Sequence, residues 1–179
     1  MPAAVHVALL NGYAPRWTDA LVGGIADAMS RPAEAFPVEL DTVLAFAPGR
    51  RQYHATLLLA ALLRHRRDPT AKIIGLTSMD LFIPVLTFVF GQSQLDGPGA
   101  IVSTHRLRTE YYGLPPDEGL LVDRAIKEAV HELGHAFGLV HCPEPDCVMR
   151  ASTYVEEVDL KRSEFCARCS ESLRETGGR

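Results

Sequence analysis

The segment His131-Glu-Leu-Gly-His-Ala-Phe-Gly-Leu-Val-His141 decides the fold, because three histidines and a glutamate occur in it at fixed spacing. His131 and His135 are four residues apart, and on a helix such residues point to the same side and can reach one ion. Gly138 lacks a Cβ, so it can adopt a backbone angle that ends the helix and turns the chain back. His141 then arrives as a third ligand.

This spacing predicts a catalytic zinc site on His131, His135 and His141. Catalytic zinc sites keep one coordination position open beside three protein ligands, whereas structural sites are closed. Glu132 directly follows the first ligand and can contact a water molecule bound to the ion. The alternative is a helix whose histidines are only solvated or packed in the core, and the combined spacing argues against it.

Length and composition predict a single soluble globular domain. The 179 residues are enough for one core, and a hydrophobic content of 47% with a charged content of 22% is ordinary. The net charge of −4 does not favour nucleic acid as a partner. The longest apolar stretch, Leu81–Phe90, has ten residues and is too short to span a membrane. We expect neither nucleic acid nor a membrane as a partner. The sequence does not determine the oligomeric state, and we favour a monomer.

The first apolar segment of the sequence is typical of a strand, not of a signal peptide. Val5–Leu10 has no basic residues before it, contains His6, and lacks a cleavage site before Asn11. We therefore expect a cytoplasmic protein, in which cysteine thiols stay reduced.

Hydrophobic periodicity predicts an α/β (α+β-like) fold, in which strands and helices alternate and strands then crowd into a mixed sheet with packed helices. Strands are expected at Val5–Leu10, Val38–Phe46, Lys72–Leu76, Thr87–Phe90 and Ala100–Thr104. Helices are expected at Trp17–Met29, at Tyr53–Leu62 and after the N-cap Asp117, where the last helix carries His131 and His135. Residues 175–179 are expected to be a frayed tail.

All four cysteines of the chain lie after the third histidine. Their spacing is Cys-x4-Cys, then eighteen residues, then Cys-x2-Cys, and two close pairs of this kind predict a tetrahedral thiolate zinc site. Two disulfides, four unrelated buried thiols and an iron–sulfur cluster are the alternatives, although ferredoxin spacings differ from this one. The predicted ligands are Cys142, Cys147, Cys166 and Cys169.

Cys142 directly follows His141, so the first thiolate ligand and the third imidazole ligand are neighbours in the chain. We therefore expect the thiolate site to help hold His141 in place through the backbone. Met149 lies eight residues beyond His141. Methionine packs almost anywhere, but behind an extended histidine motif it is typical of the methionine turn beneath the three imidazoles.

The combined histidine and cysteine pattern resembles the archaemetzincins, a family of small metzincin-type zinc proteases. The resemblance is closest over residues 117–169 and extends more weakly to residues 74–81, 88–91 and 102–106. It implies a metzincin fold with a twisted mixed sheet, an active-site helix and a small C-terminal zinc subdomain built on the four cysteines. It also implies one catalytic zinc on the three histidines, one structural zinc on the four cysteines, and Glu132 as general base. The 179 residues would form one catalytic domain with a cleft between an upper subdomain, 1–138, and a lower one, 139–170.

The function expected from these residues is hydrolysis of peptide bonds in a peptide or protein substrate. Zinc lowers the pKa of its bound water toward about 7, and Glu132 would take the proton and pass it to the leaving amine. Two alternatives remain: a zinc-stabilised peptide-binding module without efficient catalysis, and a non-peptide amide hydrolase. Specificity, and endopeptidase against aminopeptidase-like action, stay open.

A peptide could add to the sheet along Thr87–Phe90 if this strand is an edge. An internal strand with filled hydrogen bonds is the equal alternative. The loop Asp96–Gly99 is a candidate for closing the cleft.

Overall fold

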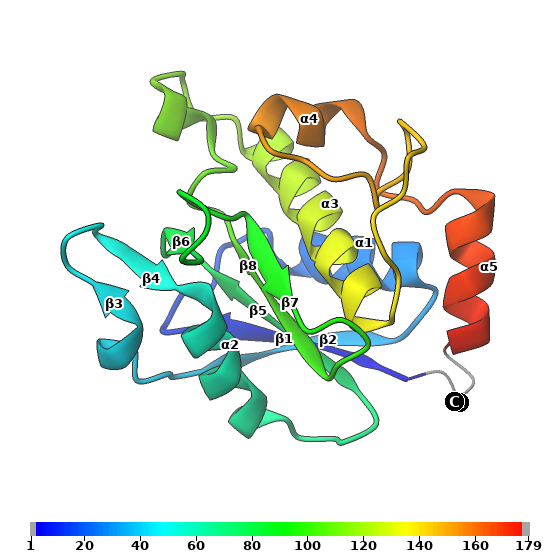
Figure 1. The fold of residues 1–179 in the computed structure, drawn as a ribbon, viewed down its shortest axis with the longest axis horizontal. Coiled ribbons are helices and arrows are strands. Elements are labelled where there is room, and N and C mark those ends of the chain that lie inside the picture. The colour runs from blue at the N-terminus through cyan, green and yellow to red at the C-terminus, as the bar shows by residue number, and fades with distance from the viewer. Residues whose placement is uncertain (1–2, 177–179) are drawn as a thin grey trace.

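A five-stranded sheet with the order β2–β1–β5–β8–β7 forms the centre of the fold (Figure 1). The computed structural model describes residues 3–176. Four strands run parallel, and β7 is an antiparallel edge strand paired only with β8 among the described strands. The strands are β1 (Val5–Leu10), β2 (Ala33–Val38), β5 (Lys72–Thr77), β7 (Gly91–Ser93) and β8 (Gly99–Ser103).

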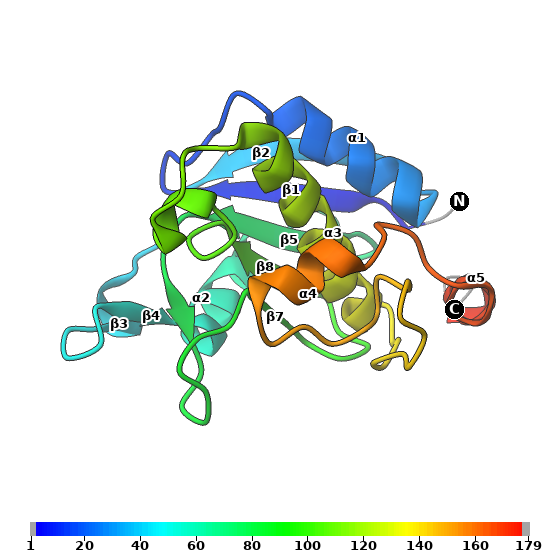
Figure 2. The ribbon, with the colours of Figure 1, turned by 90° about the horizontal axis from the view of Figure 1, so that it is seen from above.

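Helices cover both faces of this sheet, because its strands alternate apolar side chains between the two faces (Figure 2). Helices α1 (Thr18–Met29) and α3 (Glu118–Ala136) pack on one face, against residues such as Val7, Ile74 and Val102. Helix α2 (Ala55–Leu62) packs on the other face, against Ala8 and Ile101. No helix among residues 3–176 is both long and apolar enough to cross a membrane.

A second, three-stranded sheet lies beside α2 with the order β3–β4–β6. Short 3₁₀ helices connect several of the larger elements. The bounds are η1 (Val43–Ala45), β3 (Phe46–Ala47), β4 (Gln52–His54), η2 (Leu63–His65), β6 (Leu81–Phe82) and η3 (Thr109–Tyr112).

Helix α3 begins and ends at the residues that local chemistry favours. The Asp117 side chain accepts a hydrogen bond from the Leu120 backbone N–H at 2.9 Å, as expected for an N-cap. At the other end Gly138 has φ +92°, which a side chain with a Cβ would resist. The turn at Gly138 sends the chain back along α3, so the segment that follows it, with His141, Cys142 and Cys147, runs beside this helix (Figure 1).

Two helices follow the cysteine loop: α4 (Val155–Leu160) and α5 (Ala167–Thr176). The sequence did not predict either of them. The Glu157 carboxylate accepts from the backbone N–H groups of Thr153 and Tyr154 and so caps α4. Residues 175 and 176 of the expected tail end α5, and residues 177–179 lie outside the described residues.

Most predicted elements are confirmed, and two strands are wrong. The strand expected at Val38–Phe46 is instead β2, Ala33–Val38, followed by η1. Pro37 lies inside β2. An edge strand tolerates proline because half of its backbone groups have no neighbouring strand. Val43 and Leu44 are 77% and 86% exposed, so their apolar character does not mark a buried strand.

The strand expected at Thr87–Phe90 is also wrong, because the regular strand β7 begins at Gly91. Only Val89 forms an isolated bridge, with Leu81. The carbonyl of Thr87 accepts hydrogen bonds from the side chains of Arg50 and Gln52, at 3.0 Å each. Side chains here replace the backbone partners that a strand would need.

Candidate active site and metal centres

Two of the predicted zinc ligands lie on one side of α3. The His131 Nε2 and His135 Nε2 atoms are 3.2 Å apart. His141 comes from the loop after Gly138, and its ring centroid is 5.3 Å from that of His131 and 4.8 Å from that of His135. The structure therefore brings the three predicted histidines together, with ligand atoms within 4.8 Å of one another.

Hydrogen bonds determine which nitrogen of two of the rings is free. His131 Nδ1 donates to the Val148 carbonyl at 2.8 Å, and His135 Nδ1 donates to the Leu139 carbonyl at 2.7 Å. A neutral imidazole that donates from Nδ1 carries a lone pair on Nε2. The two Nε2 lone pairs thus face each other without a proton between them, and a shared cation relieves their repulsion.

The ligand spacing fits zinc. Two nitrogens bound at about 2.0–2.1 Å in tetrahedral geometry are separated by about 3.3–3.4 Å, close to the 3.2 Å between His131 Nε2 and His135 Nε2. Burial lowers the pKa of His131 well below its ordinary value and also lowers that of His135. Both imidazoles are therefore neutral near pH 7, which is the form that binds metal.

Glu132 is buried beside the histidines and turns toward the edge strand β7. Burial, with the nearby charge of Glu128, raises the pKa of Glu132 to about 8, while a hydrogen bond from the Ser93 hydroxyl favours the charged form. A cation on the histidines would lower this pKa, because an opposite charge favours the carboxylate. A Cβ on Gly91 would lie 2.6 Å from Glu132 Cγ, so this glycine gives the carboxylate its space.

A cavity of about 240 Å³ opens in front of Glu132 and two of the histidines. One side is the segment before β7, and the other is the segment that follows Met149 in the chain. The lining residues are Leu86, Thr87, Phe88, Val89, Phe90, Gly91, Glu128, His131, Glu132, His141, Ala151, Ser152 and Thr153. The loop Asp96–Gly99 is absent from this set, and the Asp96 N–H instead donates to the His135 carbonyl at 2.9 Å.

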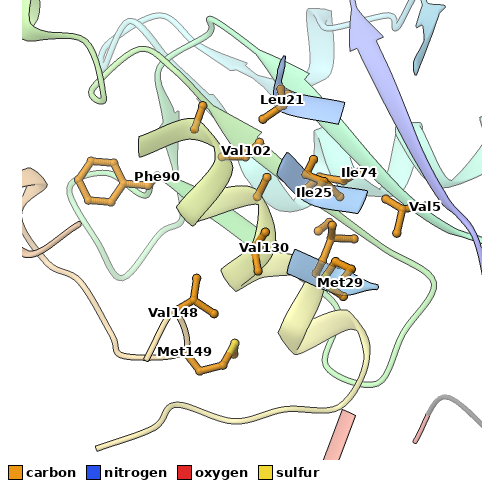
Figure 3. Packing of buried hydrophobic residues seen from close by; sticks show 14 of the residues in the cluster. Val5, Leu21, Ile25, Met29, Ile74, Phe90, Val102, Val130, Val148 and Met149 are labelled. Carbon is orange, nitrogen blue, oxygen red and sulfur yellow. The ribbon is translucent and has the colours of Figure 1, made fainter. Parts of the chain in front are cut away.

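Met149 is fully buried directly against α3 (Figure 3). Its side chain fills the space over Gly134, where an added Cβ would overlap the Met149 sulfur. Figure 3 shows Val148 and Met149 on the side of α3 away from Ile25 and Met29 of α1. Because Val148 also accepts the hydrogen bond from His131, the turn at Val148 and Met149 holds the His131 imidazole in place.

The four cysteines form a second cluster, with all sulfur atoms within 4.8 Å of one another. Cys142 Sγ and Cys166 Sγ are 3.8 Å apart, which matches the separation of about 3.8 Å for two sulfurs bound at 2.3 Å to tetrahedral zinc. All four thiols are free, which argues against the alternative of two disulfides. Cys169 and Cys147 are buried.

Polar contacts tie the thiolate cluster to its surroundings. Burial opposes ionisation of Cys142, but hydrogen bonds from the Glu144 backbone and from Arg168 outweigh it and lower the pKa of this thiol to about 7. The Cys142 N–H donates to the Met149 carbonyl at 2.9 Å. The residue after His141 is thus fixed to the same turn that supports His131.

Comparison with known proteins identifies the family of the chain. The family model described as peptidase family M54 matches residues 38–175. The chain belongs to peptidase family M54. An archaemetzincin of Methanocaldococcus jannaschii is 41% identical over 137 residues, which are 75% of this chain and 73% of the relative.

Solved structures of M54 relatives share the fold as well. The archaemetzincin of Methanopyrus kandleri superposes with a TM-score of 0.86 at 35% identity, covering 99% of this chain and 97% of the other. A protein described as a zinc-dependent peptidase from Methanocorpusculum labreanum gives a TM-score of 0.85 at 31% identity, covering 94% and 99%. The predicted archaemetzincin family and mixed α/β fold are confirmed, and this M54 member is a zinc metallopeptidase.

Several residues of the site have no signal in the sequence. Glu128 and Lys161 form a buried ion pair with 2.9 Å between Lys161 Nζ and Glu128 Oε1. Ser93 and Gly91 contact Glu132 from another element of the fold. These residues are far from their partners along the chain. No sequence motif with fixed spacing could therefore predict the contacts.

Proposed function

We propose that the chain hydrolyses peptide bonds with Glu132 as general base, beside a catalytic zinc on His131, His135 and His141. The observation that carries this proposal is the place of Glu132, which lines the same cavity as two of these histidines. When bound, zinc supplies a water of lowered pKa, toward about 7, and polarises the substrate carbonyl.

The residues of the chain perform the remaining steps. His131 and His135 are held by their Nδ1 hydrogen bonds, so their Nε2 atoms need no reorganisation before binding the ion. Glu132 takes a proton from the attacking water and later gives it to the leaving amine. The Ser93 hydroxyl and Gly91 keep the Glu132 carboxylate turned toward the cavity.

We further propose a second, structural zinc on the four cysteines, which makes two zinc ions per chain. Four free thiols with sulfurs this close favour a shared cation over independent thiols. The cytoplasmic location that the sequence predicts would keep these thiols reduced and able to bind zinc. Elemental analysis is expected to give two zinc ions per chain, one of which mild chelation removes first.

An extended peptide would bind along the outer edge of β7. The edge strand expected at Thr87–Phe90 is in the structure the strand Gly91–Ser93. This strand is the last in the sheet order and Gly91 lines the cavity. Backbone hydrogen bonds to an edge strand give affinity without sequence preference. The substrate would then lie between an upper subdomain, 1–138, and a lower one, 139–170.

Replacement of Glu132 tests the mechanism. Glu132→Ala is expected to retain both zinc ions and to lose about 10²–10⁴-fold in peptide turnover, because positioned proton transfer contributes that much. Cleavage of a peptide library by both proteins, with zinc content measured alongside, provides the comparison. Undiminished hydrolysis by Glu132→Ala would reject the mechanism.

The same experiment separates the alternatives. A peptide-binding module would retain peptides without cleaving them, and its binding would not change in Glu132→Ala. A non-peptide amide hydrolase would leave the library intact but cleave small amides in a Glu132-dependent way.

A further inference from the structure

Glu128 is a cleft residue that the hydrolytic mechanism does not use. It lies one helical turn before Glu132 on α3 and lines the same cavity. Its side chain is only 4% exposed. Carboxylates are rarely buried this deeply unless they are paired.

Lys161 is the partner of Glu128, and it approaches from the protein interior. Its Nζ lies 2.9 Å from Glu128 Oε1, its side chain is 0% exposed, and it is not among the residues that line the cavity. The same Nζ donates to the Arg150 carbonyl at 3.2 Å. Glu128 Oε1 has no other donor among the described residues. A carboxylate offers about four acceptor sites on its two oxygens, and Lys161 approaches only Oε1.

Ser152 supplies a second unpartnered polar atom in the wall of the cavity. Its Oγ is buried and makes no hydrogen bond within the described part of the chain. A buried hydroxyl without a partner is costly. Glu128 lies on α3 and Ser152 on the segment after Met149, so two walls of the cavity hold buried polar atoms that a substrate could reach only if these side chains turned toward it.

The charged side chains that line the cavity are acidic, while the nearest cations are Lys161 behind Glu128 and the zinc ion that we propose on the histidines. The lining includes the carboxylates of Glu128 and Glu132 and contains no lysine or arginine among the described residues. The opposite side presents Phe88, Val89 and Phe90. Apolar walls with a carboxylate at one point suit a side chain with a long methylene stem and a cationic end.

We propose that Glu128, assisted by Ser152, selects substrates with lysine or arginine next to the scissile bond. The substrate cation would donate to the free acceptor sites of Glu128 and to Ser152 Oγ, while its stem contacts the aromatic wall. This inference rests on the proposed peptidase function and adds its substrate class.

The test compares peptides that differ at one residue. The peptides share one sequence except at a single position, which carries lysine, arginine, norleucine or glutamate. In one series this position directly precedes the scissile bond, and in a second series it directly follows it. The zinc-loaded wild type is expected to favour lysine or arginine over norleucine by about ten- to a hundredfold in kcat/KM at one position. Equal or better cleavage of norleucine peptides at every position overturns the proposal.

Variants of the ion pair separate selection from structural support. Glu128→Gln is expected to reduce the lysine-to-norleucine ratio to about threefold or less, and Ser152→Ala to reduce it less. Glu128→Gln leaves Lys161 with an unpaired buried charge and can unfold the domain. The double variant Glu128→Gln/Lys161→Met removes both charges and is expected to keep the fold with the same loss of selection. A lysine preference that survives in the folded double variant contradicts the proposal.

Lys161→Met provides the sharper contrast, because it leaves Glu128 without its internal partner. The unpaired buried carboxylate also lowers stability, so folding is checked by thermal unfolding first. In the folded variant, selection for lysine is expected to persist or increase, whereas a merely structural ion pair would lower cleavage of all peptides equally. Glu118→Gln, at the exposed start of the same helix, is the matched control and is expected to leave the ratio unchanged.

Binding measurements keep the specificity proposal testable if the peptidase proposal fails. Zinc-loaded Glu132→Gln protein is titrated with fluorescent lysine and norleucine peptides, and anisotropy reports each Kd. Binding of the lysine peptide that is tighter by about tenfold or more supports the selection by Glu128. Equal affinities overturn it, and absent cleavage by the wild type counts only against the hydrolytic mechanism.

Discussion

The histidine cluster and the cysteine cluster adjoin each other in the chain but differ in exposure. His141 is exposed and His135 is half-buried, and the cluster faces a cavity. Three of the four cysteines are buried, and the four come from a loop and from the start of α5. An open centre leaves room for a substrate, whereas a closed one joins segments of the chain. This difference predicts that changes at the cysteines affect the fold and that changes at the histidines affect turnover.

Loss of one cysteine is expected to have the largest effect on stability. Cys166→Ser should lower the free energy of unfolding by several kcal/mol, a part of the roughly 10–16 kcal/mol that structural zinc contributes in small peptides. It should also weaken the catalytic zinc, because Cys142 is fixed beside His141. Zinc competition with a chelator and thermal unfolding measure both effects. Glu171→Gln on the exposed face of α5 is the control, and intact catalytic-zinc affinity in Cys166→Ser would refute the coupling.

A methyl group on Gly134 tests the turn that supports the imidazoles. Gly134→Ala should cost about 1–3 kcal/mol because its Cβ overlaps the Met149 sulfur. Gly23→Ala in α1 is the control, since a Cβ there meets nothing within 4 Å, and it should be neutral or stabilising. Calorimetry on the zinc-loaded proteins gives both values. The double variant Gly134→Ala/Met149→Ala should lose less stability than the sum of the two single variants, and strict additivity would exclude this overlap as the cause.

A methyl group on Gly91 should affect stability less than turnover. Its Cβ would lie 2.6 Å from Glu132 Cγ and 2.7 Å from the Ile101 carbonyl oxygen. Gly91→Ala should therefore displace the carboxylate and reduce kcat about 10- to 100-fold while both zinc ions stay bound. Steady-state kinetics with elemental analysis tests this, and an unchanged kcat would show that Glu132 tolerates the shift.

Loss of one histidine is expected to have the smallest effect on the fold. In the metal-free protein His135→Ala removes one hydrogen bond, to the Leu139 carbonyl, which contributes about 1 kcal/mol. Turnover should nevertheless disappear, and one of two zinc ions should be lost. Chemical denaturation without metal and kinetics with metal provide the comparison. A loss of stability as large as that in Cys166→Ser would remove the distinction between the two centres.

The sequence predicted the parts of the site that depend on local spacing. His131 and His135 are one helical turn apart, and Gly138 has the positive φ that the turn requires. The cysteine pairs are also local, and their sulfurs converge as expected. Strand prediction failed at Val38–Phe46 because an edge strand accepted Pro37. It failed at Thr87–Phe90 because the Thr87 carbonyl bonds to the side chains of Arg50 and Gln52, and Val89 forms only an isolated bridge.

Residue spacing could not predict contacts between segments that are distant along the chain. Glu128 reads as an ordinary polar residue of an amphipathic helix, and Lys161 as a solvated lysine after α4, yet they meet in the interior. Their pairing depends on how α4 packs on α3, which no local pattern specifies. The residues that we propose to choose the substrate are thus found only in the structure.

The four-cysteine cluster has a consequence for the biosynthesis of the enzyme. Translation makes His131, His135 and His141 before Cys166 and Cys169 emerge from the ribosome. If the thiolate cluster is what holds His141, a nascent chain carries every catalytic group yet cannot assemble them. The newly made peptidase would then stay inactive until its last cysteine has joined the others.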